Sequence, residues 1–407
     1  MSCNPRKAAR SARPLLASAA VALCVLSPRA ARAEPYMAIR EGRKCSSCHV
    51  NETGGGMRTL LANTHLQEIT HYRDLFPEFA QAADAFNGQI TSFLSIGGDL
   101  RVNDSIVFQD EPNAQGRVPN GKVFRSNVDE NILEIREASF YALVGLIPDY
   151  LEVYTDISYA PGGTVAREVF GLMKGILPWR GYVKAGRFFL DYGLRTENDN
   201  LFALDNEANK IFVRGRTGTD FQSSDDGAEF ALEPGPFHFS VSVTDGPPGD
   251  ADVRVTTNAY AMLRDLPIVD DAIVGASFLH VAPQDQERYV YGFYAGANLG
   301  RFEYQGEVDW IHDSFSGTQP AVGTFLVYGE LNYLLLDWIN CKAFAEYTDN
   351  DSDATTNDDS QNRFGLGIEP FLGRFLQTRL FYSIANGPEN QPPANQNRLV
   401  MEIHFFF

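Results

Sequence analysis

The feature that most constrains the fold is an alternation of apolar and polar residues, which recurs from about residue 92 to the C-terminus. Residues 237–244 and 302–310 are the clearest segments, because nearly every second residue in them is large and apolar. Successive residues of a β-strand point to opposite sides, so each segment would have one apolar and one polar face. Alternating segments of about ten residues separated by turns are typical of transmembrane β-barrels. We therefore expect an all-β transmembrane barrel over residues 91–407.

The connections between these segments differ in length in a regular way. Short turns lie near residues 147–149, 178–180, 234–236, 299–301 and 372–374. Longer polar connections lie near residues 110–129, 190–223, 246–255, 312–322, 349–362 and 386–396. Short turns on one rim and long loops on the other are the arrangement of bacterial outer-membrane barrels. The sequence thus predicts a barrel in outer-membrane lipid, with its short turns in the periplasm.

We predict about sixteen antiparallel strands, with about fourteen or about eighteen as alternatives. Their expected starts are near residues 92, 130, 150, 166, 181, 224, 237, 256, 272, 288, 302, 323, 339, 362, 375 and 397. An even number returns the chain to its starting side, so both chain ends would lie at the periplasmic rim. The last strand alternates up to Phe407, which resembles the sorting signal of outer-membrane barrels. In a soluble β-sandwich, the alternative fold, this apolar strand would form an aggregation-prone edge.

The first 33 residues have the pattern of a signal peptide. A basic start, an apolar run over residues 15–26 and the small-residue pattern of residues 31–33 predict cleavage before Glu34. Leu23 before Cys24 is a poor lipoprotein signal. Removal of six basic residues would change the net charge from −18 to about −24. Such an acidic chain is a poor partner for nucleic acid and attracts cations.

Three cysteines follow the predicted cleavage site, and two of them form a motif. Cys45, Cys48 and His49 make a C-x-x-C-H run, the attachment motif of c-type haem. Each thiol can form a thioether with the haem, and the adjacent histidine supplies the proximal iron ligand. We therefore predict one covalent haem c. The alternatives are a disulfide with an incidental histidine and, more weakly, a zinc site, which lacks a second cysteine pair.

Residues 34–90 form the predicted haem segment, between the signal peptide (1–33) and the barrel (91–407). Helical spacing is expected over about residues 58–72 and 79–86. A segment this short buries little surface alone, so the haem and the barrel wall would supply most of its core.

The distal ligand of the haem iron has several candidates. His65 shares a helical face with Leu61 and would point inward, and Met57 follows a flexible run of three glycines. His71 and Met37 are weaker candidates, and an open sixth position is a further alternative. Histidine would give a lower reduction potential than methionine.

The haem motif, the minimal haem segment and the barrel ending in Phe407 together resemble the fused outer-membrane monohaem cytochrome–porins associated with extracellular iron oxidation. The resemblance covers the mature chain by architecture and is specific at residue level only at Cys45, Cys48 and His49. It implies a one-electron oxidoreductase that takes electrons from extracellular Fe(II) and passes them to a periplasmic cytochrome. It assigns no catalytic residue beyond the haem ligands.

Two other functions are compatible with the same sequence. One is a passive outer-membrane diffusion porin, in which the haem segment serves as a plug, sensor or docking piece. The other is a soluble or peripheral periplasmic cytochrome fused to a β-sandwich. Porins of this size are often trimers, although no feature of this sequence identifies a trimer contact.

Other candidate features carry weaker predictions. The longest connection is basic, and its side chains could contact haem propionates, constrict the pore or remain solvated: Arg195, Lys210, Arg214 and Arg216. An acidic loop over residues 349–359 could attract divalent cations weakly or simply stay solvated, since its calcium-loop pattern fails at Ala354 and Ser360. Four histidines are expected to be barrel-wall residues: His238, His280, His312 and His404. Cys341 is expected to face lipid.

Overall fold

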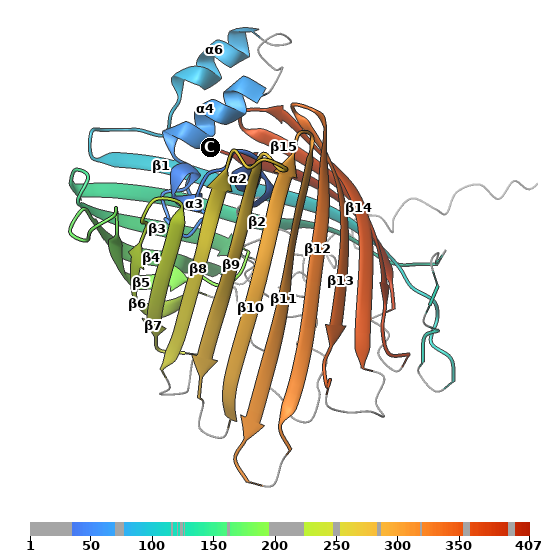
Figure 1. The fold of residues 1–407 in the computed structure, drawn as a ribbon. Coiled ribbons are helices and arrows are strands. Elements are labelled where there is room, and N and C mark those ends of the chain that lie inside the picture. The colour runs from blue at the N-terminus through green and yellow to red at the C-terminus, as the bar shows by residue number, and fades with distance from the viewer. Residues whose placement is uncertain are drawn as a thin grey trace, which may run out of the picture.

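The structure, a computed structural model, is a closed antiparallel β-barrel with short helices at one rim (Figure 1). It describes residues 35–69, 77–114, 117–119, 121–122, 125, 127–160, 163–194, 224–246, 253–282, 286–317, 320–352, 359–389 and 395–407. The predicted signal peptide, most of the longest connection and His71 lie outside the described residues. Each strand pairs with its neighbours in sequence, and β16 pairs with β1 to close the barrel.

Sixteen strands occur in the described ranges, which confirms the predicted fold class and strand number. They are β1 (Leu94–Phe108), β2 (Val128–Ile147), β3 (Leu151–Ala160), β4 (Gly163–Lys174), β5 (Tyr182–Phe189), β6 (Ser224–Leu232), β7 (Phe237–Thr244), β8 (Arg254–Arg264), β9 (Asp271–Val281), β10 (Gln286–Leu299), β11 (Phe302–Phe315), β12 (Val322–Leu336), β13 (Ile339–Asp349), β14 (Ser360–Gly373), β15 (Leu376–Asn386) and β16 (Asn397–Phe406). A single closed sheet is not the β-sandwich considered as an alternative.

The expected and observed strand starts differ most for β4, at residue 166 against Gly163. A β-bulge explains the difference. Asp156 pairs with Glu168 and Ile157 with Ala166, so the residue between them has no counterpart in β3. Arg167 and Glu168 are consequently both buried, which interrupts the alternation on which the prediction relied.

The two faces of the wall have opposite character. In β7, Phe237 and Phe239 are 46 % and 47 % exposed on the outer face, whereas His238 and Ser240 on the lumen face are 1 % and 3 % exposed. A water-soluble barrel would place its apolar side chains inside. The outward apolar band is instead the arrangement that suits a surrounding hydrocarbon layer.

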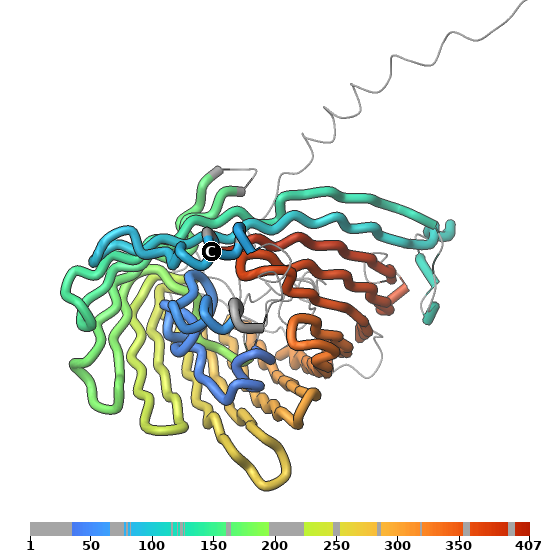
Figure 2. Tube along the Cα trace, turned by 90° about the horizontal axis from the view of Figure 1, so that it is seen from above, coloured from blue at the N-terminus to red at the C-terminus, as the bar shows by residue number. Residues whose placement is uncertain are grey.

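The helices precede the barrel in sequence and gather at the rim formed by the short turns. They are α2 (Pro35–Arg40), α3 (Cys45–Cys48), α4 (Leu60–Ile69) and α6 (Pro77–Ala85). Viewed from above, the first of them lie within the outline of the barrel mouth (Figure 2). α2 contacts β9, β10 and β11. Among the described helices, none combines the length and apolar character that crossing a membrane requires.

Large rings inside the lumen lie flat against the wall because glycines face them. A Cβ atom added at Gly367 would overlap the ring of Phe381, and one at Gly365 would overlap the ring of Phe344. Both rings are nearly buried, at 8 % and 5 % exposure. Close packing here therefore depends on the missing side chains of the two glycines.

We expect Gly367→Ala to lower the free energy of unfolding by about 1–3 kcal/mol, because the new methyl group would displace the Phe381 ring. Gly329→Ala is the matched control, since the nearest atom to its added Cβ is Tyr304 Oη at 3.9 Å. Urea unfolding in lipid vesicles, followed by tryptophan fluorescence, measures both. Equal unfolding midpoints for the two variants would contradict the packing argument.

Candidate haem-binding site

The C-x-x-C-H motif forms one turn of helix followed by extended backbone. α3 spans Cys45–Cys48, and His49 N donates to Cys45 O at 3.0 Å. His49 itself is extended, with φ −118° and ψ 146°, so its ring leaves the helical turn. Both thiols are half-buried and separate from one another. The turn thereby presents two thiols and an imidazole close together, which is the donor set that attaches haem c.

A hairpin-like return holds this turn in place. Val50 N donates to Met57 O at 3.0 Å, and Thr59 N donates to Cys48 O at 2.9 Å. The reversal between them uses Gly54, Gly55 and Gly56, all with positive φ. A side chain at Gly56 would also overlap the hydroxyl of Tyr154 in β3. The three glycines therefore form a turn, as the sequence predicts, and this turn is pressed against the wall.

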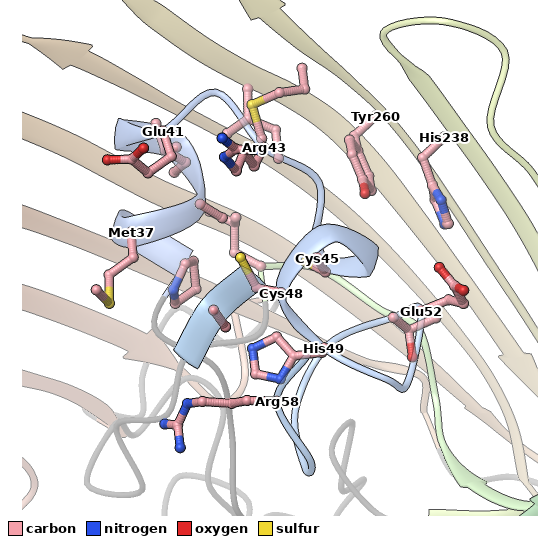
Figure 3. Close-up of a pocket in the computed structure, with 18 of the residues that line it drawn as sticks. Met37, Glu41, Arg43, Cys45, Cys48, His49, Glu52, Arg58, His238 and Tyr260 are labelled. Carbon is pink, nitrogen blue, oxygen red and sulfur yellow. The ribbon is translucent and has the colours of Figure 1, made fainter. Parts of the chain in front are cut away.

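The motif opens onto a cavity of about 290 Å³ that the N-terminal segment and the barrel wall form together. Cys45, Cys48 and His49 line it (Figure 3). Its apolar lining from the segment includes Ile39, Leu61 and Ala62, and from the wall Tyr260, Met262, Ile273 and Tyr294. A mostly apolar cavity with a few polar groups is the usual setting of a bound cofactor.

Two arginines line the same cavity, Arg43 and Arg58. The Arg58 guanidinium lies 3.8 Å from the ring centroid of Phe406 in β16. Guanidinium groups are suited to carboxylates, so these side chains would pair with the propionates of a haem. Thiols, imidazole, apolar lining and basic groups thus all fit haem c, whose presence remains a prediction.

The segment is fixed to the wall by buried polar contacts. Asn51 Nδ2 donates to Glu168 Oε1 at 2.8 Å, and Lys184 Nζ donates to Asn51 Oδ1 at 3.2 Å and Thr53 Oγ1 at 3.3 Å. The Lys184 ammonium is fully buried and pairs with Glu229 at 2.8 Å. The haem motif is therefore held inside the barrel by β4, β5 and β6.

A second anchor joins the motif to the turn between β6 and β7. Ser46 Oγ donates to Glu233 Oε1 at 3.1 Å, and Lys44 Nζ lies 3.6 Å from Glu233 Oε2. Burial would raise the pKa of Glu233, but its hydrogen bond with His238 and the charge of Lys44 hold that pKa below its ordinary value. Glu233 therefore stays ionised and keeps both contacts.

Another part of the wall of the cavity comes from residues 190–194, which turn inward after β5. Asp191 accepts hydrogen bonds from Ser240 Oγ at 2.6 Å and Asn258 Nδ2 at 2.9 Å, and lies 3.0 Å from His238 Nε2. Leu194 N donates to Glu307 Oε2 at 2.8 Å. The first described residues of the longest connection therefore cross the lumen, whereas its predicted basic side chains lie outside the described residues.

The structure separates the candidates for the distal ligand. His65 lines the cavity, and its Nε2 lies 3.7 Å from Glu41 Oε1. Met37 lines it as well. Met57 does not, because its side chain is 5 % exposed and packs with Tyr141 and Tyr154 against the wall. The choice of ligand stays a prediction, with His65 and Met37 the two that share the cavity with His49.

The structure also places the other residues that the sequence singled out, namely the barrel histidines, Cys341 and part of the acidic loop. His238 and His404 are buried lumen-wall residues, while His280 and His312 have partly or fully exposed side chains. Cys341 is a half-buried side chain next to lumen-facing Lys342. In the described part of the acidic loop and elsewhere in the described ranges, no three His, Cys, Asp or Glu side chains are arranged to hold a metal ion.

Sequence reasoning missed the contribution of the wall. In β8, Tyr260 and Met262 follow the phase of Thr256 and Asn258 and so occupy the lumen face. Large apolar residues on a face that is otherwise polar were the signal that something packs there. Arg43 and Arg58 had no comparable signal, since spacing along the chain does not reveal which charges line a cavity.

Comparison with known proteins supports the barrel only. No protein-family model matches the chain, and no curated protein sequence matches it. Solved structures do match. OmpT of Vibrio cholerae shares 10 % identity at a TM-score of 0.53 over 78 % of this chain and 99 % of its own. The anion-selective porin of Comamonas acidovorans shares 11 % identity at 0.51, over 77 % and 99 % respectively. This chain has a porin-type fold.

We expect Lys184→Met to loosen the N-terminal segment, because it removes a buried ion pair and two contacts to Asn51 and Thr53. Breaking one partner of such a pair costs about 3–5 kcal/mol. Limited proteolysis should then cleave within residues 35–69 faster than in the unchanged protein. Lys122→Met, at a lysine 46 % exposed, is the control and should leave cleavage unchanged. Unaltered cleavage in both would show that this contact does not hold the segment.

Proposed function

We propose that this protein is an outer-membrane electron conduit with one haem c. In this proposal it relays electrons between an extracellular donor, Fe(II) by resemblance, and a periplasmic electron carrier. The observation that carries the proposal is the joint cavity: Cys45, Cys48 and His49 open toward side chains of the barrel wall. A redox group bound there would lie inside a membrane-crossing barrel and not beside it.

The outer-membrane location rests on the outer face of the barrel. The outward side chains of β7 are apolar and 44–47 % exposed: Phe237, Phe239, Val241 and Val243. The lumen-facing side chains of the same strand are polar. Such a band matches a hydrocarbon layer, and closed barrels are the β-structures that cross one. The porin-type neighbours are outer-membrane proteins by their own descriptions, which agrees with this location.

Each part of the site has a role in the proposal. The thiols of Cys45 and Cys48 would attach the haem, His49 would ligate its iron, and His65 or, alternatively, Met37 would be the distal ligand, since both line the cavity. The bound haem would supply reversible one-electron chemistry, so that one Fe(II) oxidised outside corresponds to one electron delivered to the periplasmic carrier. Tyr260, Met262 and Tyr294 would exclude water from the cavity.

A second function is favoured by the structural neighbours. The anion-selective porin of Comamonas acidovorans and the outer-membrane channel DcaP of Acinetobacter baumannii have barrels of this type. A passive diffusion porin, with the haem segment as a plug or docking piece, would have the same overall architecture. The two functions differ in what crosses the membrane, which is electrons in the first and solutes in the second.

Reconstitution into liposomes distinguishes the two functions. With an oxidant enclosed and Fe(II) added outside, the conduit should show haem reduction followed by reduction of the enclosed oxidant. If the haem accepts no electron from outside, or passes none inward, the conduit proposal fails. Solute flux that is independent of haem oxidation state would identify a diffusion porin.

Covalent attachment is tested separately. We expect Cys45→Ala combined with Cys48→Ala to abolish haem staining on a denaturing gel, because no thioether can form. Cys341→Ala is the matched control and should retain the stain, since that thiol belongs to β13 and not to the cavity. The gel-mobility difference between heated and unheated protein checks that the barrel is folded. Absence of stain in the unchanged protein would overturn the cofactor assignment.

The distal ligand gives a further prediction. His65→Phe should change the visible spectrum and the reduction potential of the haem, because it would open the sixth coordination position. Met57→Leu should leave both unchanged, since Met57 packs against Tyr141 and Tyr154 away from the cavity. A spectral change in Met57→Leu alone would assign the methionine instead.

A further inference from the structure

The lumen is packed beyond the haem cavity as well as around it. Leu190, Asp191, Tyr192 and Leu194 of the inward-turning residues are between 1 % and 5 % exposed. Tyr192 Oη donates to Asp309 Oδ1 at 2.7 Å, and Gly193 N donates to Ser277 Oγ at 2.8 Å. The chain therefore turns from the end of β5 into the lumen and reaches lumen-facing side chains of β9 and β11, four and six strands along the wall, through space that an open pore would leave to water.

Apolar side chains fill the lumen next to this crossing. Leu190 and Tyr192 pack in one buried cluster with lumen-facing side chains from β9–β13, β15 and β16. We use the name lumen cluster for six members, which are 0–4 % exposed: Leu190, Tyr192, Leu279, Val290, Ile311 and Leu326. Side chains that lined a water-filled channel would not be buried to this degree.

Three members of the lumen cluster form a continuous row across β9, β10 and β11. Val290 pairs directly with Leu279 of β9 and with Ile311 of β11, so the three side chains form one row. Leu326 of β12 is opposite Asp309, one lumen-facing position along from Ile311. The interiors of porin barrels are polar, so an apolar row on the lumen face departs from the pattern of a channel.

Across the lumen from β9–β12, charged side chains of β1–β4 form buried ion pairs. Arg101 lies 3.5 Å from Glu137, Arg167 lies 3.4 Å from Asp156, and Arg167 also contacts Glu137. All four of these residues are 4 % exposed or less. These charged side chains of β1–β4 therefore pair with one another and do not line a water-filled channel.

We propose that the lumen cluster is a dry barrier that closes the barrel to ions and small solutes. An apolar constriction excludes water, and an ion that entered it would lose hydration that the apolar side chains do not replace. The proposal deepens the electron-conduit function, on which its purpose rests: electrons would cross by way of the haem while the membrane stays sealed. It predicts that the barrel, despite its porin-type fold, is not an open pore.

Single-channel recording of the full haem-loaded chain in a planar lipid bilayer tests the barrier. The unchanged protein should show no stable open-channel current. Ile311→Asp should produce an open-channel current at least about tenfold above the baseline of the unchanged protein. The reason is that the carboxylate would hydrate the row formed with Leu279 and Val290. Ile311→Val is the matched control and should remain closed.

A second variant covers the case in which Ile311→Asp does not fold, as judged by the gel-mobility difference on heating. Val290→Thr keeps the side-chain shape at the centre of the row and adds a hydroxyl group, and should also raise conductance above that of the unchanged protein. Open-channel current in the unchanged protein would overturn the proposal. So would closed recordings for a folded Ile311→Asp variant, or for Val290→Thr where the first variant does not fold.

The outcome is independent of the electron-transfer assay. A sealed barrel whose haem passes no electrons in liposomes would refute the conduit and leave the barrier standing. A barrel that passes electrons and also conducts ions would refute the barrier and leave the conduit standing.

Discussion

The structure depends on the closure of its sheet. Backbone N–H and C=O groups that face hydrocarbon have no water to pair with, so a β-structure in a bilayer must join its first and last strands. The pairing of β1 with β16, from Asp99 opposite Phe406 to Phe108 opposite Asn397, meets this requirement. Closure of the sixteen described strands encloses a lumen, which must be filled by either water or side chains. In this chain the described lumen-facing residues are mostly buried, so side chains fill much of it.

The filling explains why apolar side chains of the predicted haem segment, where the structure describes it, cluster with side chains of the wall. Val50 and Met57 pack into a cluster with Tyr141, Tyr154 and Phe170 of the wall, and Ile39 packs into another with Tyr260 and Tyr294. The segment contributes one side of each cluster and the barrel contributes the other. A stretch this short would bury too little surface alone, and fusion to a barrel supplies the missing half.

The sequence was sufficient to predict the strands of the barrel wall, but not the contacts between residues inside the lumen. Alternation located the sixteen described strands because lipid outside and polar groups inside impose a period of two, and its largest error lies where the Arg167 bulge breaks that period. Contacts across the lumen join residues far apart in the chain, such as Lys184 with Asn51 or Asp191 with His238. No local pattern encodes such pairs. The C-x-x-C-H motif could be found in the sequence because its residues are adjacent, whereas the cavity that it faces is assembled by the barrel, and the haem itself stays a prediction.

The seam between β1 and β16 lies directly beneath the haem segment. Arg58 stacks on Phe406 on one side of the seam, and Met57 lies beside Gly97 on the other. A segment that contacts both β1 and β16 stabilises their pairing, because separating the two strands would break its contacts with one of them. Seating of the segment and closure of the sheet are therefore thermodynamically linked, so whatever strengthens one raises the population of the other. The barrel and its insert should accordingly melt as one cooperative unit.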